Sequence, residues 1–393
     1  MEKKRILIVG GGASGLMAAI TAARRGAAVT VLEHNEKPGK KLCATGNGKC
    51  NLTNLEMPRD AYRGAHPEFV REALRQFSVQ DTVRFFSELG IYVTNRNGYL
   101  YPHSNQASSV TEVLCMEARS LKVKIKTNEH VKAVFPEGGL WKVQTEGWTY
   151  EGDAVILANG SKASAISGSD GSGYELAKSL GHRVIKPLPA LNALKCKGKS
   201  FAAWAGVRVE GKVTLCLEDI PLKSQQGELQ LTEYGISGIP VFQLSRYAIR
   251  ALDEGCRVSL LVNFLPEFDA GSLHSFLESR RRKCPYKNDQ ELLIGLFPDK
   301  LNKVLLKQPD LEAAIREFPL TVTGGMPFAQ AQVCSGGVST EEVRPDTMES
   351  RLHKGLYFAG ELLDVDGTCG GYNLQWAWSS GAAAGSHAAG EET

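Results

Sequence analysis

The sequence lacks the features that mark several protein classes. Its nine cysteines form an odd set without a C-x-x-C pair, and the first residues are charged, unlike the apolar core of a signal peptide. We therefore expect a cytoplasmic protein with mostly reduced cysteines. Glycines interrupt the longest apolar runs, so no segment is expected to span a membrane. The eight histidines show no metal-ligand spacing, and we expect no metal site.

An excess of charge of one sign is also missing. The net charge is +3, from 46 Lys and Arg against 43 Asp and Glu. This balance is too even to argue for nucleic acid or an anionic membrane as the main partner, and we expect neither. The partner that we expect is a small-molecule substrate, on the motifs described below. With 393 residues, 42% hydrophobic residues and 41 glycines, the composition is that of a globular α/β protein with more than one domain or a large insertion.

The chain opens with a pattern that predicts a β-α-β unit. Residues 5–9 are all apolar after the first, as in a parallel strand buried on both faces. Residues 16–25 continue as an alanine-rich helix that ends at Gly26, and residues 29–32 form a second strand. The two strands and the helix thus enclose a glycine-rich turn.

The glycines of that turn have the G-x-G-x-x-G spacing of a dinucleotide site. Gly10 allows a tight turn, Gly12 lets the backbone approach a pyrophosphate, and Gly15 lets helix and strand pack closely. Glu33, at the carboxyl end of the second strand, is placed to accept hydrogen bonds from ribose hydroxyls. The unit predicts a site for the adenosine diphosphate half of a dinucleotide, with a ligand-free glycine turn as the alternative.

Two further regions favour FAD over NAD. Residues 37–54 form a glycine- and lysine-rich loop after the second strand, where backbone amides with Lys40, Lys41 and Lys49 suit a polyanion. Residues 153–160 and 355–385 contain two more apolar strands, each of which ends at glycine.

The last of these regions carries Glu361 directly after its strand, followed by a long helix of small residues that starts near Asn373. This arrangement resembles that of flavoproteins of the glutathione-reductase-like superfamily. The resemblance implies that the Glu361 carboxylate contacts the ribityl hydroxyls of FAD. The amino end of the helix would then face the flavin edge on which charge gathers during reduction.

The chain as a whole resembles the bacterial YhiN/BaiN-like NAD(P)/FAD-dependent oxidoreductases. The resemblance covers about residues 5–388 and rests on several motifs: GGGASGLMAAI, GKKLCATGNGKCNLTN, YPHSNQASSV, GSDGSGYELAKSLGH, GELQLTEYGISGIPVFQLSR, TVTGGM and TMESRLHKGLYFAGELLDVDGTCGGYNLQWAWSSGAAAG. It implies an α/β fold in which a discontinuous Rossmann-like FAD-binding domain carries an inserted β-barrel and a small helical subdomain.

We accordingly expect FAD-binding segments at residues 1–188 and 320–393, with an inserted substrate domain at 189–319 whose helical subdomain spans about 267–312. Together with the spacing arguments, the resemblance implies one set of cofactor-binding residues. That set is Gly10, Gly12, Ala13, Ser14, Gly15, Glu33, Lys40, Lys41, Thr45, Gly46, Cys50, Asn51, Val131, Gly160, Gly360, Glu361, Gly371, Tyr372, Asn373 and Leu374.

Candidates for chemistry beyond the flavin are few. His103 is the histidine that we would test as a proton donor, and Tyr372 lies on a segment that the resemblance places near the flavin. Cys43 and Cys50 occupy the loop in which flavin-linked disulfide reductases carry a redox pair. Their C-x6-C spacing and the absence of a second nicotinamide-binding β-α-β unit argue against that role.

We therefore expect an FAD-dependent oxidoreductase that reduces an unsaturated or oxo organic substrate, with oxo-bile acids implied by some relatives. NADH or NADPH would act as a transient reductant. An FAD-dependent oxidase or dehydrogenase of a small amine is the alternative within the family. An RNA-modifying flavoprotein and a non-catalytic redox-sensing flavoprotein are alternatives of other classes.

Overall fold

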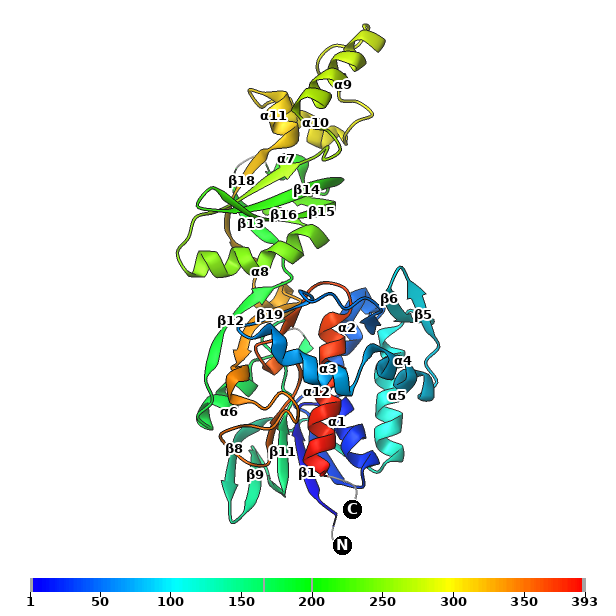
Figure 1. Cartoon of the computed structure of the whole chain (residues 1–393), viewed down its shortest axis with the longest axis vertical. Coiled ribbons are helices and arrows are strands. Elements are labelled where there is room, and N and C mark those ends of the chain that lie inside the picture. The colour runs from blue at the N-terminus through cyan, green and yellow to red at the C-terminus, as the bar shows by residue number, and fades with distance from the viewer. Residues whose placement is uncertain (1–2, 165–166, 199–200, 391–393) are drawn as a thin grey trace. The chain divides into compact units, whose positions relative to one another are not determined.

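The computed structural model describes residues 3–164, 167–198 and 201–390. Contacts divide the chain into two units (Figure 1): residues up to Pro187 joined with those from Val333 onward, and an inserted unit, Leu188–Gln332. The insertion ends later than the predicted residue 319. The reason for this difference is that Phe318–Gly325 is a strand of the inserted barrel.

The first unit is built on a five-stranded parallel sheet with the order β20-β11-β1-β2-β7. Its strands are β1 (Arg5–Val9), β2 (Ala28–Leu32), β7 (Lys124–Lys126), β11 (Ala154–Leu157) and β20 (Leu356–Phe358). The predicted β-α-β unit is present as β1, α1 (Ala13–Arg24) and β2. The helix begins three residues before the predicted start, directly after Gly12.

Smaller sheets and helices complete this unit. The remaining strands are β3 (Thr53–Asn54), β4 (Tyr62–Arg63), β5 (Val93–Arg96), β6 (Tyr99–Pro102), β8 (Val131–Glu137), β9 (Leu140–Thr145), β10 (Thr149–Gly152), β12 (Val184–Ala190), β19 (Val333–Val338) and β21 (Asp366–Gly367). The remaining α-helices are α2 (Lys40–Gly48), α3 (Val70–Gln76), α4 (Val79–Glu88), α5 (Ala107–Ser120), α6 (Ser172–Ser179) and α12 (Tyr372–Ala389).

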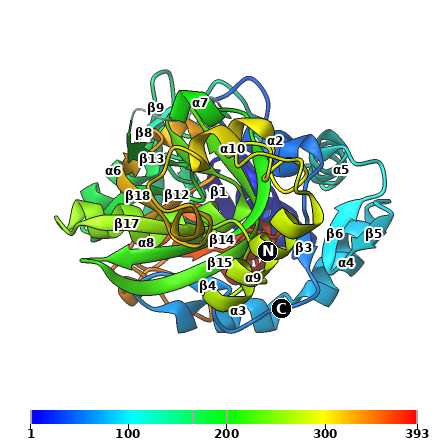
Figure 2. The same ribbon diagram turned by 90° about the horizontal axis from the view of Figure 1, so that it is seen from above.

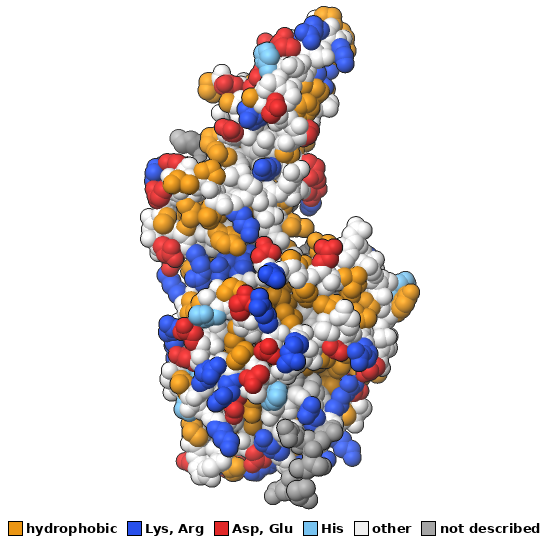
Figure 3. Space-filling view, in the orientation of Figure 1, with side chains coloured by type: hydrophobic (Ala, Val, Ile, Leu, Met, Phe, Trp, Pro, Cys, Tyr) orange, Lys and Arg blue, Asp and Glu red, His pale blue; other side chains and the backbone are white. Residues whose placement is uncertain are grey.

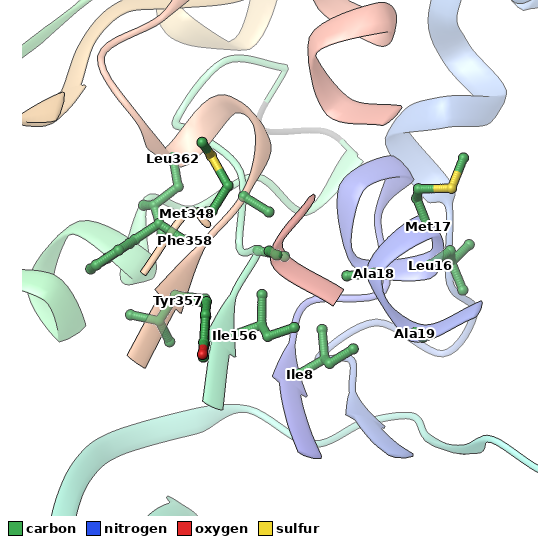
Figure 4. Packing of buried hydrophobic residues seen from close by; sticks show 14 of the residues in the cluster. Ile8, Leu16, Met17, Ala18, Ala19, Ile156, Met348, Tyr357, Phe358 and Leu362 are labelled. Atoms are coloured by element: carbon green, nitrogen blue, oxygen red, sulfur yellow. The ribbon is translucent and has the colours of Figure 1, made fainter. Parts of the chain in front are cut away.

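The core of the first unit lies between the central sheet and its helices. Figure 4 shows Ile8 of β1 and Ile156 of β11 beside Leu16 and Met17 of α1, and all four side chains are buried. In addition, β10 contacts β1 and β9 contacts β11. Strands that are covered on both faces are continuously apolar, which explains the sequences of β1 and β11.

The first and last helices of this unit, α1 and α12, pack closely (Figure 1). A Cβ added at Gly381 would lie 2.5 Å from the carbonyl oxygen of Ser14, and one at Gly385 would lie 2.3 Å from that of Ala18. Glycine is needed at both positions because the two backbones approach too closely for a side chain. The small residues near the end of the chain thus fix α12 against the glycine-turn helix.

The inserted unit contains a closed antiparallel barrel with the order β13-β16-β15-β14-β17-β18. Its long strands β14 and β15 lie next to each other in Figure 2. The barrel strands are β13 (Leu194–Lys197), β14 (Arg208–Leu217), β15 (Ile220–Thr232), β16 (Gly235–Ser237), β17 (Val258–Asn263) and β18 (Phe318–Gly325).

The helices of the inserted unit are α7 (Phe201–Trp204), α8 (Ile239–Asp253), α9 (Ala270–Lys283), α10 (Asp299–Leu305) and α11 (Leu311–Arg316). The predicted α/β class with a Rossmann-like domain, a barrel and a small helical part is therefore confirmed. Within the part of the chain that the structure describes, no helix combines the length and apolar character needed to cross a membrane.

Candidate active site

Steric constraints differ among the three glycines of the first turn. Gly10 has a φ of 103°, and an added Cβ would lie 2.5 Å from the carbonyl oxygen of Ala158. A Cβ at Gly15 would lie 1.9 Å from the carbonyl oxygen of Gly10. At Gly12, in contrast, a Cβ would meet no atom within 4 Å. The protein itself therefore requires glycine at the outer two positions, whereas Gly12 borders open space.

The amino end of α1 faces that open space with its hydrogen-bonding groups available. The helix has Gly12 as its N-cap, no side-chain cap and no acidic residue in its first turn. Such an end presents free N–H groups and the positive end of the helix dipole, which suit a phosphate. Ala13 and Ser14 are the first two residues of this turn, and the geometry fits the predicted diphosphate of FAD.

Glu33 lies beside the same turn with only 5% of its surface exposed. Its Oε2 accepts a hydrogen bond of 2.7 Å from the backbone N–H of Gly11. Its Oε1 accepts bonds of 2.8 Å from both the backbone and the side-chain N–H groups of Asn35. These contacts fix the carboxylate next to the glycine turn, and its oxygens have further lone pairs for ribose hydroxyls.

Lys41 and Glu361, both predicted cofactor ligands, meet in an ion pair of 2.6 Å. The other carboxylate oxygen of Glu361 accepts hydrogen bonds from the Ser161 hydroxyl at 2.8 Å and from the Cys334 amide at 3.2 Å. Ser161 was missed by the sequence analysis. Its position directly after Gly160, in the turn that follows β11, was a signal that pointed to it.

The α2 segment is irregular where the predicted contacts lie. Thr45 is extended and Gly46 is left-handed, with a φ of 57°. Cys50 is fully buried, and its burial raises the pKa of its thiol to about 12. The side-chain nitrogen of Asn51 donates to the carbonyl oxygens of Thr53 and Leu100, and its side-chain oxygen accepts a hydrogen bond from the Gly371 amide at 3.2 Å. Lys40, at the start of this helix, points to solvent.

The amino end of α12 is uncapped like that of α1. Gly371 is its N-cap, and the first turn contains no acidic residue. Tyr372 is buried, while Asn373 holds the preceding loop through hydrogen bonds with both backbone groups of Gly367, at 2.8 and 3.0 Å. Leu374 packs partly buried against the core. Asn373 thus serves the loop, and the free amides of this turn are the groups left for a ligand.

Trp376 and Ser380 of α12 hold the Gly360 turn, a role that the sequence analysis missed. The Trp376 indole N–H donates to the Gly360 carbonyl at 3.0 Å, and the Gly360 amide donates to the Ser380 hydroxyl at 2.9 Å. A Cβ at Gly360 would lie 2.4 Å from the Ser14 hydroxyl oxygen. Both backbone groups next to Glu361 are therefore fixed.

A buried ion pair holds the loop before α12. Arg63 of β4 lies 3.0 Å from Asp366 of β21, and it also donates to the Gly367 carbonyl at 3.0 Å. The two side chains are almost fully buried. No short-range signal in the sequence identifies such a pair, because its members are about 300 positions apart.

Val131, Gly160 and His103 complete the set of predicted residues. Val131 is buried at the start of β8, and Gly160 has a φ of 75° with open space where a Cβ would stand. His103 is exposed and lies beside the Tyr92 ring, with centroids 5.4 Å apart. Nothing in this geometry distinguishes His103 as a proton donor, and its role stays a prediction.

Residues 4–387 match the family model described as the HI0933-like protein Rossmann domain. The chain belongs to this family. It is 48% identical to the 3-dehydro-bile acid delta(4,6)-reductase of Clostridium scindens, over 98% of this chain and 99% of the relative. It is also 31% identical to the ribosomal RNA dihydrouridine synthase of Haemophilus influenzae, over 95% and 96% of the two chains.

A solved structure supports the fold of this HI0933-like chain. The 3-ketosteroid delta1-dehydrogenase of Sterolibacterium denitrificans aligns with a TM-score of 0.53 at 12% identity, over 99% of this chain and 100% of that chain. Together these findings confirm the predicted family and the prediction of an FAD-dependent oxidoreductase. The individual site residues stay predictions.

Proposed function

We propose that the HI0933-like chain reduces a carbon–carbon double bond conjugated to a carbonyl group in an oxo-steroid acid, with NADH or NADPH as the source of electrons. The observation that carries this proposal is the 48% identity, over nearly the full length of both chains, to a reductase of 3-dehydro-bile acids. The alignment covers 98% of this chain and 99% of the relative, so both units of this chain take part in the match.

The chemistry divides between cofactor and protein. When bound and reduced, FAD would supply the hydride for the carbon β to the carbonyl, and a proton would complete the reduction at the α carbon. In the proposed site, the amides at the start of α1 bind the diphosphate and Glu33 holds the ribose. Glu361, fixed by Lys41 and Ser161, is placed for the ribityl hydroxyls.

The uncapped start of α12 has a separate task in this proposal. Its free amides and dipole stabilise negative charge, which favours the reduced cofactor. The loop that leads into this helix is held by Asn373 and by the Arg63–Asp366 pair. These residues position the amides and need not touch the substrate.

The second candidate function is reduction of a uridine in ribosomal RNA. The relative from Haemophilus influenzae favours it, because its name describes formation of dihydrouridine. The uracil double bond is also conjugated to a carbonyl, so one flavin site suits both reactions. The balanced charge of the chain favours the small molecule, and Figure 3 shows Lys and Arg interspersed with Asp and Glu on the face in view.

An anaerobic experiment tests the proposal. The purified FAD-loaded protein is mixed with NADH or NADPH, and the flavin absorbance is followed. A 3-oxo-Δ4 steroid acid is then added to the reduced protein, and the product mass is measured. Bleaching by a nucleotide, recovery on steroid addition and a product two mass units heavier support the proposal. Recovery only with an unmodified ribosomal RNA fragment supports the second function instead.

A further inference from the structure

We propose that Arg96 binds the anionic group of the substrate, and that the hairpin carrying it recognises an amphiphilic organic acid: a flat apolar body with a carboxylate at one end. This inference rests on the proposed function, since it deepens the description of the same substrate.

The β5–β6 hairpin provides a rigid support for this side chain. Arg96 pairs with Tyr99 across the hairpin, and the two residues between them, Asn97 and Gly98, have φ values of 53° and 90°. Positive values at both positions identify a tight turn that matches the strand twist. The Gly98 carbonyl also accepts a 2.9 Å hydrogen bond from the Leu55 amide. Arg96 is therefore held next to the segment that follows the α2 loop.

The same hairpin borders two predicted cofactor-binding turns. The nearest Tyr101 ring atom lies 3.9 Å from the position of a Cβ at Gly46, in the α2 segment. The nearest Tyr99 ring atom lies 3.0 Å from that of a Cβ at Gly370, just before α12. Tyr99 and Tyr101 are two residues apart in β6 and share one face. A substrate at the predicted flavin site thus lies within reach of this face.

The Arg96 guanidinium is oriented without being neutralised. It lies 5.4 Å from the centroid of the Tyr101 ring, and its Nη2 donates a 2.7 Å hydrogen bond to the Asn105 side-chain oxygen. Among the residues that the structure describes, no carboxylate forms an ion pair with it. The remaining N–H donors form a planar fork that matches a carboxylate.

Two large apolar side chains are exposed beside the Arg96 turn, and they indicate the rest of the ligand. Leu55 is 49% exposed and Tyr99 is 41% exposed, and backbone pairing places both beside the hairpin turn. Figure 3 shows hydrophobic side chains grouped over the part of this unit in which Figure 1 places β5 and β6. An exposed apolar surface with one unneutralised cation fits a ligand that is apolar along its body and charged at its end.

Two matched ligands test the proposal: 3-oxo-4-cholenoic acid and its methyl ester, which has the same ring body without the charge. Their binding to the FAD-loaded protein is measured by perturbation of the flavin spectrum, and their turnover is measured separately. We expect Arg96→Gln to weaken binding of the acid about tenfold and to leave the ester unchanged, because one charge-assisted contact is lost. Arg96→Lys should retain part of the preference for the acid.

Arg84→Gln is the control variant, since Arg84 of α4 is an exposed arginine that already pairs with Asp81 at 2.8 Å. Equal effects of Arg96→Gln on acid and ester, or no effect on either, would overturn the proposal. So would wild-type protein that binds neither ligand. Binding with the expected preference but without turnover would refute the proposed function alone. Loss of ribosomal RNA binding in Arg96→Gln, with acid binding unchanged, would assign the cation to RNA and refute the small-acid ligand.

Discussion

Replacement of Gly12 by alanine tests directly whether the first glycine turn is a ligand site. The residue has φ −78° and ψ −167°, values that any residue adopts, and an added Cβ meets no atom within 4 Å. Loss of glycine flexibility in the unfolded chain gains about 0.4–1 kcal/mol, and alanine at an N-cap costs a similar amount. We therefore expect the unfolding free energy of the apoprotein to change by less than about 1 kcal/mol.

The same substitution should damage cofactor binding. The methyl group would occupy the space through which a diphosphate approaches the amides of α1. Loss of one charge-assisted hydrogen bond costs about 1.5–3 kcal/mol, which corresponds to a rise of about 10- to 150-fold in the Kd of FAD. The measurements are thermal unfolding of the apoprotein and titration with FAD followed by flavin fluorescence.

Gly15→Ala is the control variant, for which we expect a loss of apoprotein stability. Its Cβ would lie 1.9 Å from the Gly10 carbonyl oxygen, so the backbone must move. Overpacking of this kind costs about 1–3 kcal/mol or more, which lowers the Tm of the apoprotein by several degrees. If Gly12→Ala kept the wild-type Kd for FAD, or lowered the Tm as Gly15→Ala does, the ligand interpretation of Gly12 would be wrong.

Three further outcomes are expected. Glu33→Gln should raise the Kd of FAD about tenfold while the visible flavin spectrum stays unchanged, since in the proposed site Glu33 binds the ribose and not the flavin ring. A shifted spectrum would contradict this. Simultaneous replacement of Cys43 and Cys50 by alanine should leave flavin reduction intact, because the pKa of Cys50, raised to about 12, keeps its thiol protonated at neutral pH. Loss of reduction with FAD retained would revive a disulfide mechanism. Burial lowers the pKa of His182, whose Nδ1 lies 3.1 Å from Glu342. Below about pH 6.5, therefore, the His182 side chain binds a proton more readily in the unfolded chain than in the folded chain. The free energy of unfolding should therefore fall as the pH decreases from about 7 to 5, and denaturant titrations of His182→Gln should show a flatter pH profile than wild type.

The local parts of the fold could be predicted from the sequence. The periodicity of residues 5–33 gave β1, α1 and β2, and the glycine spacing placed the turn between them correctly. These features depend on neighbouring residues, whose contacts follow from the helix and strand repeats. The helix was predicted to start at Leu16, three residues later than the observed start of α1 at Ala13. Ser14 and Gly15 are weak helix formers, so the prediction assigned them to the glycine turn.

The contacts that fix the candidate site could not be predicted in the same way. Lys41 and Glu361 were each chosen as ligands, but their ion pair joins positions 320 residues apart. The hydrogen bond from Trp376 to Gly360 likewise depends on the orientation of α12 against the sheet. Such pairs follow from tertiary packing, and one sequence without homologues contains no signal for them.

The close packing of α12 against α1 has a consequence for the order of events during synthesis. The glycine turn leaves the ribosome first, whereas Gly381 and Gly385 follow more than 350 residues later. Until α12 is made, one side of α1 lacks its packing partner, and the nascent chain has only part of the predicted cofactor site. Domains are made at about 5–20 residues per second, so the early segment waits for on the order of tens of seconds. If the predicted site is correct, tight binding of FAD requires α12, and a chain that ends before Gly381 should bind FAD weakly.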